Sequence, residues 1–208
     1  MPAVANPIRI RSDDWSTLPK DYTLYGIKFI NKYTGTHLRR GEDKIVGTSD
    51  EFTVSSGQTV STNIDETTVY RAEFVVQDEL TSVTTSGKNQ VTNTNKIKRG
   101  SLASDKDLSI NIQVNANGDI TVLPVKGDNQ TVTGTGKWVE DGDEWGGEKR
   151  NVIYLEYQFQ DQEVVERKVF GSVVARTTLS LTHTVKDTLV MRDRNVKFEE
   201  LVIDLNKK

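Results

Sequence analysis

The segment KWVEDGDEWGGEKR, residues 137–150, combines the side-chain types that recognise sugars. Trp138 and Trp145 flank an acidic turn, and Arg150 follows the second tryptophan. Flat aromatic rings stack on the C–H faces of a sugar, while carboxylates such as Asp143 and guanidinium groups bond its hydroxyls. The segment therefore predicts a carbohydrate contact on a turn between two strands. The alternative interpretation is that both tryptophans close one end of a barrel as structural plugs.

A second mixture of the same kind, NKYTGTHLRRGED at residues 31–43, follows the first predicted strand. We expect His37 to lie at the surface, where it is available for binding. The alternative is a charged hairpin end that is only solvated. The candidate ligand-binding residues are therefore Trp145, Trp138, Tyr33, His37, Arg39, Arg150 and Asp143.

Catalytic and metal sites find little support in the sequence. The chain has no cysteine and only two histidines, which excludes thiol catalysis and cysteine-based zinc sites. As an EF-hand loop starting at Asp141, the acidic turn would place Trp145 and Val152 where oxygen ligands are required. His183 falls on the apolar side of an alternating strand, so we expect a hydrogen-bonded core histidine. We predict no metal, no cofactor and no catalytic residue.

The charge balance excludes two further classes of partner. The 27 basic and 30 acidic residues give a net charge of −3, which provides no general attraction for a phosphate backbone. We therefore predict no nucleic-acid binding. No apolar run approaches the roughly 20 residues needed to cross a bilayer, so we expect no membrane-spanning segment. The N-terminus shows no export signal.

Alternation of apolar and polar residues predicts an all-β fold. Residues 108–114 alternate between apolar and polar side chains, and Asn117-Gly118 is a strong signal for a hairpin turn. Residues 119–125 are then expected to form the second strand of the hairpin. The abundance of threonine and valine suits pleated, half-buried surfaces. Further strands are expected at 23–30, 69–77, 131–139, 151–159, 163–170, 178–185, 187–192 and 196–204.

Close strand spacing and one-sided alternation favour antiparallel pairing. We expect either an antiparallel barrel, a calycin-like or lipocalin-like meander, or a two-sheet β-sandwich. Residues 1–21 are proline-rich and predict an extended lead-in. Residues 22–208 then form a single antiparallel β domain, with a long polar loop at 86–107.

Four strings carry a resemblance to a known family: WSTLPKDYTLYGIKFINKYTGTHLRRGED, VYRAEFVVQDEL, TGTGKWVEDGDEWGGEKRNVIYLEY and KDTLVMRDRNVKFEEL. Over residues 7–205 the chain resembles the C-terminal domain of a Bacteroidetes surface lipoprotein family associated with SusC/SusD-like glycan uptake. In that family this domain of unknown function follows an N-terminal Ig-like domain. The resemblance implies an accessory protein that faces the cell surface or the periplasm and is held at the outer membrane by a lipid anchor. If Met1 is the native start, a cytoplasmic location is expected instead.

These observations lead to one preferred function and two alternatives. The preferred function is a non-catalytic carbohydrate-binding or adhesion-type module of an outer-surface glycan-utilisation lipoprotein. Its expected partners are a glycan and SusC/SusD-like uptake proteins. The first alternative is a structural or assembly domain that packs on a partner of the uptake complex. The second is a glycosidase-like hydrolase that uses a pair of acidic residues.

Overall fold

The computed structural model describes residues 4–6, 23–25, 29–99, 103–127 and 131–194. Residues 31–195 form one compact unit, while residues 1–30 and 196–208 group separately. In the second group, strands β1 (Val4–Asn6) and β2 (Thr23–Tyr25) pair antiparallel. The expected boundary between residues 21 and 22 and the expected strand 196–204 lie outside the described residues.

The compact unit is built from nine antiparallel strands and one short 3-10 turn, η1, at Val75–Gln77. The strands of the first half are β3 (Gly35–Thr53), β4 (Gln58–Tyr70), β5 (Glu79–Gly87) and β6 (Gln90–Ile97). The strands of the second half are β7 (Lys106–Val114), β8 (Asp119–Pro124), β9 (Thr133–Trp145), β10 (Glu148–Val169) and β11 (Ser172–Asp193).

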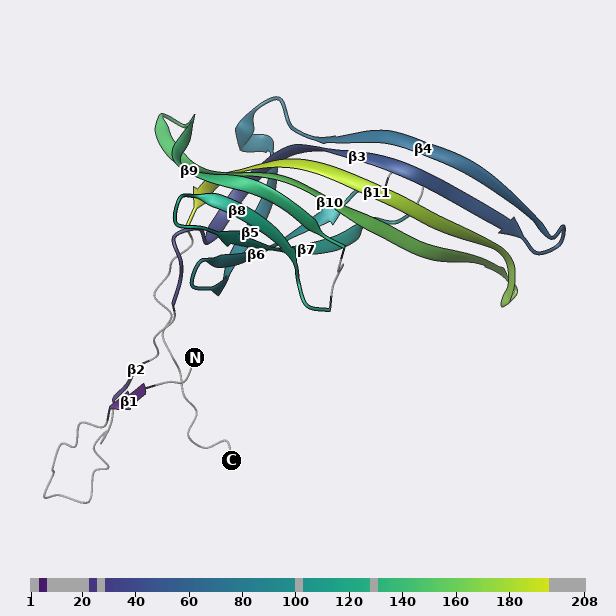
Figure 1. Ribbon diagram of the computed structural model, residues 1–208, viewed down its shortest axis with the longest axis horizontal. Coiled ribbons are helices and arrows are strands. Elements are labelled where there is room, and N and C mark those ends of the chain that lie inside the picture. The colour runs from purple at the N-terminus through teal and green to yellow at the C-terminus, as the bar shows by residue number, and fades with distance from the viewer. Residues whose placement is uncertain (1–3, 7–22, 26–28, 100–102, 128–130, 195–208) are drawn as a thin grey trace, which may run out of the picture. The chain divides into compact units, whose positions relative to one another are not determined.

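The nine strands form one sheet that closes on itself. Successive strands from β5 to β11 are neighbours, β5 pairs with β3, and β11 returns to pair with β3 along most of its length. The strand β4 pairs with β3 beside this ring, and β3, β4, β10 and β11 run on together past the shorter strands (Figure 1). The predicted all-β antiparallel fold is confirmed, and closure into a ring distinguishes it from two stacked sheets.

The main core fills the ring with alternate residues of its strands, because successive side chains of a strand point to opposite faces. The predicted hairpin is present: Val114 pairs with Ile120, and Gly118 adopts φ 84° at the turn. Leu108, Ile110 and Ile112 are buried on one face, as their alternation predicts.

Several element predictions were wrong. The predicted polar loop at 86–107 contains β6, whose Val91, Asn93 and Asn95 face inward and are buried. Asn93 is satisfied there by hydrogen bonds to Thr81 and Ser82, so a polar sequence still forms a ring strand. The segment 69–77 is not one strand, because β4 ends at Tyr70 and η1 follows.

The long strands also differ from the prediction. The separate strands expected at 151–159 and 163–170 are parts of β10, and those at 178–185 and 187–192 are parts of β11. No described helix is long and apolar enough to span a membrane.

Candidate functional site

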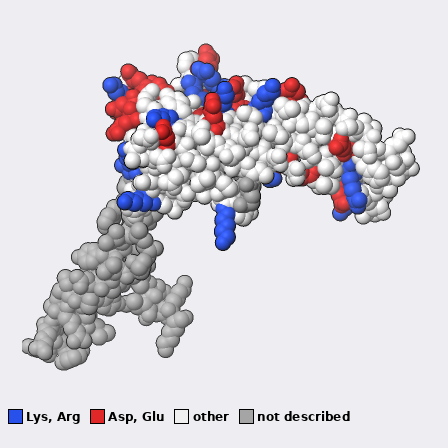
Figure 2. Space-filling model, viewed as in Figure 1, with Lys and Arg blue, Asp and Glu red and all other residues white. Residues whose placement is uncertain are grey.

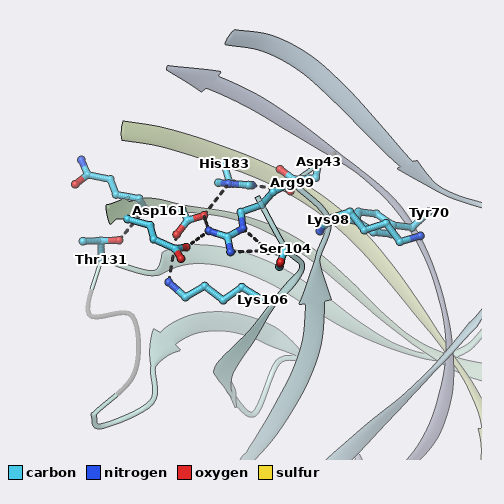
Figure 3. Close-up of polar contacts among 11 residues, drawn as sticks. Asp43, Tyr70, Lys98, Arg99, Ser104, Lys106, Thr131, Asp161 and His183 are labelled. Carbon is cyan, nitrogen blue, oxygen red and sulfur yellow. Dashed lines mark hydrogen bonds and ion pairs between the residues drawn. The ribbon is translucent and has the colours of Figure 1, made fainter. Parts of the chain in front are cut away.

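A cluster of charged side chains lies buried inside the ring, between β3, β10 and β11 (Figure 3). His183 Nδ1 lies 2.7 Å from Oδ2 of Asp43, and His183 Nε2 lies 4.0 Å from Oδ2 of Asp161. The imidazole also stacks on Phe159, with ring centroids 4.5 Å apart. His183 is fully buried, as the alternation of its strand predicts.

Arg99, in the connection between β6 and β7, brings positive charge to this cluster. Its Nη1 donates to Oδ2 of Asp161 at 3.3 Å and to Glu163, and its Nε donates to the carbonyl oxygen of Ser104 at 2.8 Å. Lys106, at the start of β7, donates from Nζ to Oδ1 of Asp161 at 3.2 Å. These contacts, drawn in Figure 3, connect the β6–β7 segment to β10.

A second buried group joins β3 to β11. Arg39 Nε donates to Oδ1 of Asp187 at 3.0 Å, and the hydroxyl of Tyr157 donates to Oδ2 of the same carboxylate at 3.0 Å. The Arg39 guanidinium carbon lies 4.1 Å from the ring centroid of Tyr70. Burial raises the pKa of Asp187, against the lowering effect of the Arg39 charge and of both hydrogen bonds. Burial also raises the pKa of Tyr157 well above its usual value.

Both groups are inaccessible to a large substrate. Asp43, Asp161, His183 and Asp187 each expose no more than 1% of their surface. A general acid or base must reach the proton that it transfers. In this structure the charged groups instead cross-link strands that are far apart in sequence. Within the described residues, no three His, Cys, Asp or Glu side chains are grouped as ligands for a metal ion.

Trp138 and Tyr33, two of the sequence candidates, come together at the ring interior. Trp138 pairs with Ile153 of β10 in the sheet register and is half-buried against the main core. The Tyr33 ring meets the indole edge-on, with centroids 5.3 Å apart, and Lys32 Nζ lies 3.8 Å from the indole centroid. This position corresponds to the plug interpretation of Trp138.

Trp145, Arg150 and Asp143 also lie together, but at the tip of the β9–β10 hairpin. Asp143 and Arg150 are register partners, and the Arg150 guanidinium carbon lies 5.2 Å from the Trp145 ring centroid. Trp145 is half-buried against a small apolar cluster that includes Leu38. Acidic side chains gather at the end of the compact unit where this hairpin tip lies (Figure 2). Ligand binding by these residues stays a prediction.

His37 and Arg39 are not at the surface. His37 is fully buried and Arg39 is 2% exposed, so the expected surface position of His37 and the alternative of a solvated hairpin end are both wrong. Residues 35–53 form the long strand β3, whose odd-numbered positions 37, 39, 43 and 45 are buried. Burial lowers the pKa of His37 from 6.5 to about 4, partly opposed by the hydrogen bond of Nδ1 with the Gly35 carbonyl.

An open groove of about 370 Å³ lies on the outer face of β9, β10 and β11. Tyr154, which is 38% exposed, is its exposed aromatic residue. The other outward-facing side chains of the groove are hydroxylic or charged: Thr135, Lys137, Glu156, Lys186 and Thr188.

The sheet register arranges these side chains in two rows across the strands. The first row contains Lys137 of β9, Tyr154 of β10 and Thr188 of β11, which are register partners. The second row contains Thr135, Glu156 and Lys186 of the same three strands. The strands β9 and β10 lie very close here, because a Cβ on Gly136 would collide with the carbonyl oxygen of Tyr154. Glycine permits this approach.

Sequence reasoning missed the residues of the groove. The signal was present in NVIYLEYQF at 151–159, where Tyr154 and Glu156 alternate with the buried Ile153 and Leu155. An aromatic residue on the polar side of an alternating strand points to the outer surface. The sequence does not reveal that lysines of two other strands flank it.

Comparison with protein-family models identifies one match that covers most of the chain. Residues 32–195 match the family model described as "Domain of unknown function (DUF5627)". A search of curated proteins finds no match.

Solved structures of Bacteroides proteins are also similar. A protein of unknown function from Bacteroides ovatus is 29% identical, with a TM-score of 0.63 over 93% of this chain and 52% of that chain. A second from the same species is 13% identical, with a TM-score of 0.36 over 81% and 51%. An auxiliary nutrient binding protein from Bacteroides thetaiotaomicron is 12% identical, with a TM-score of 0.31 over 88% and 57%.

The chain thus spans about half the length of the solved structures that it matches. The Bacteroides ovatus protein with the higher TM-score matches over almost all of this chain. Because the family model covers residues 32–195, which is most of the sequence, the protein belongs to the DUF5627 family.

Proposed function

We propose that this protein is a non-catalytic carbohydrate-binding module that serves glycan uptake at the bacterial cell surface. The observation that carries the proposal is the outer groove, in which Tyr154 is exposed between charged and hydroxylic side chains. Ligand sites combine an apolar or aromatic surface with a few polar groups that fix orientation. A sugar ring offers both an apolar C–H face and a rim of hydroxyls.

The position of the groove suits an extended ligand. Its residues project from three paired strands rather than from loops, so their backbone positions are fixed before binding. The groove is open to solvent, and a polysaccharide chain can enter and leave it sideways. The buried carboxylates around His183 are out of reach of such a chain, which supports a binding role rather than hydrolysis.

The biological setting of the proposal rests on the resemblance to lipoproteins associated with SusC/SusD-like uptake systems. In that setting the module is carried on the outer membrane by a lipid anchor and holds glycan near the uptake proteins. The Trp145–Arg150 corner of the β9–β10 hairpin is a second place for sugar contact.

A glycan array followed by affinity electrophoresis tests the function. Wild-type protein should be retarded by at least one polysaccharide, and Tyr154→Ala should lose that retardation while Tyr154→Phe keeps most of it. Leu123→Ala is the matched control, because Leu123 is 40% exposed on β8 and does not line the groove. Retardation that survives Tyr154→Ala would move the site elsewhere, with Trp145→Ala as the next variant.

A second candidate function, assembly with a partner protein, is favoured by the long hairpins. Val60 is 64% exposed on β4, Val164 is 58% exposed on β10, and Phe170 projects fully from the β10–β11 turn. A contiguous patch formed by such residues would provide an interaction surface. Replacing Val164 and Phe170 with serine should then abolish co-purification with SusC/SusD-like proteins without changing glycan retardation.

A further inference from the structure

We propose that the groove selects uncharged polysaccharides and discriminates against uronic-acid and sulfated glycans. This inference rests on the proposed function, since it names the ligand class of the same groove. It derives from the way in which both lysines of the groove are already paired. Lys137 Nζ lies 2.6 Å from Oδ1 of Asp119, and Lys186 Nζ lies 3.6 Å from Oε1 of Glu156.

The two ion pairs lie on either side of the tyrosine. Lys137 is the direct partner of Tyr154 on β9, and Asp119 is the partner of Lys137 on β8. Glu156 and Lys186 partner each other one row further along β10 and β11. A sugar stacked on Tyr154 therefore lies beside two lysines that are each paired with a carboxylate, and Glu42, the register partner of Lys186 on β3, adds a further negative charge nearby.

The neighbouring cation is also neutralised. Arg40 of β3, the register partner of Thr188, donates through its guanidinium to the carboxylate of Asp78. Asp78 in turn accepts a 2.8 Å hydrogen bond from the backbone of Ala72, which holds it in place. The groove thus lacks a cation free of a carboxylate partner among its described lining residues. Such a cation would supply the strong, charge-assisted hydrogen bonds that favour a carboxylate or sulfate.

The carboxylate of Asp119 is firmly ionised. Hydrogen bonds from Lys137 and from Asn117 lower its pKa, so it keeps its negative charge beside the lysine at neutral pH. An anionic sugar that approaches Lys137 also approaches this carboxylate, and the attraction of one is offset by the repulsion of the other. Exposed charges are further weakened by salt at physiological ionic strength.

Paired charges nevertheless suit neutral sugars well. A hydroxyl group both donates and accepts hydrogen bonds, a lysine ammonium donates three, and a carboxylate accepts several. Lys137 uses two donors, on Asp119 and on the carbonyl oxygen of Asn117. One donor remains for a sugar hydroxyl, and the free oxygen positions of Glu156 accept from another.

The test compares the full chain on neutral and acidic glycans at low salt. The neutral probes are galactomannan, arabinoxylan and amylopectin, and the acidic probes are polygalacturonate and chondroitin sulfate. The expected result is retention by a neutral probe and at least tenfold weaker binding to both acidic probes. The double variant Asp119→Asn, Glu156→Gln removes the carboxylate with which each lysine is paired, and should raise affinity for polygalacturonate several-fold, more strongly as salt is reduced.

Asp107→Asn is the matched control. Asp107 also forms an exposed ion pair, with Oδ1 3.4 Å from Nζ of Lys96, but this pair does not line the groove. The control variant should bind acidic probes no better than the wild type. Tyr154-dependent binding of wild-type protein to an acidic probe would overturn the ligand class and leave the proposed function standing. So would a double variant that binds polygalacturonate no better than the wild type. If no probe of either class is bound, the proposed function fails and this inference fails with it.

Discussion

The ring interior and the outer groove use the same side-chain types with opposite consequences. Inside, Arg39 and Asp187 form an ion pair with the hydroxyl of Tyr157 bonded to the same carboxylate, and all three are almost completely buried. Outside, Lys186 and Glu156 form an ion pair beside Tyr154, and more than half of each charged side chain is exposed. Burial decides whether such a group cross-links strands or remains available to a ligand.

The physical reason is the cost of removing charge from water. A buried ion pair repays its desolvation only when geometry and hydrogen bonds are complete, so loss of one partner leaves an uncompensated charge. An exposed pair interacts through solvent of high dielectric constant and holds its geometry weakly. The interior pairs should therefore dominate stability and the groove pairs should dominate binding.

The largest expected effect is on the interior pair. Asp187→Ala removes the carboxylate that satisfies Arg39 and Tyr157, and should lower the free energy of unfolding by about 3–5 kcal/mol. Asp187→Asn keeps the shape and should cost less. Urea denaturation followed by far-UV circular dichroism measures both. A loss below about 1 kcal/mol for the alanine variant would contradict a structural role for the pair.

The second largest effect is a pH dependence of the free energy of unfolding, which arises from the buried His37 inside the ring. Burial holds the pKa of His37 near 4 in the fold, below its ordinary 6.5. A depressed folded-state pKa contributes stability above pH 6.5, and this contribution is lost as the pH falls toward 4. The loss amounts to roughly 3 kcal/mol, at 1.36 kcal/mol per pKa unit.

Comparison of the wild type with His37→Gln isolates this effect from other acid-sensitive groups. The raised pKa of Asp187 acts in the opposite sense, because its protonated form is favoured in the fold and the stability it contributes is lost as the pH rises. Unfolding free energies at pH 7, 5.5 and 4.5 should fall more steeply for the wild type. Parallel curves for the two proteins would show that His37 does not titrate as its burial requires.

A smaller loss is expected at the boundary between interior and surface. Trp138→Ala removes an indole that is half-buried against the core and meets Tyr33 edge-on, and should cost about 2 kcal/mol. Trp138→Phe should retain about half of that stability. Thermal unfolding of the three proteins tests the plug interpretation. An alanine variant as stable as the wild type but unable to bind glycan would restore the platform interpretation.

The smallest expected effect on stability is that of the exposed Glu156–Lys186 ion pair in the groove. A double-mutant cycle with Glu156→Gln and Lys186→Met should give a coupling energy of about 0.5 kcal/mol or less, because both side chains are exposed. The same variants should still change glycan retention. A coupling energy comparable with that of the Arg39–Asp187 pair would remove the distinction between the two regions.

The parts of the fold that could be predicted are those with local signals. The hairpin from Leu108 to Val125 needs only alternation and an Asn-Gly turn, and the structure contains it. The strand β3 could not be predicted, because GTHLRRGEDKIVG is polar and charged. Its buried Arg39 meets Asp187, 148 residues later in the chain, so the signal that stabilises it is not local.

The sequence by itself determined the antiparallel all-β class and the burial of His183, since a two-residue period assigns each side chain to a face. Only the tertiary structure decided that the faces close into a ring. Closure pairs β3 with β11, which brings Asp43 beside His183 and encloses Asp43, Asp161 and Asp187 away from solvent. These neighbours are set by strand pairing between distant segments, which no local pattern encodes.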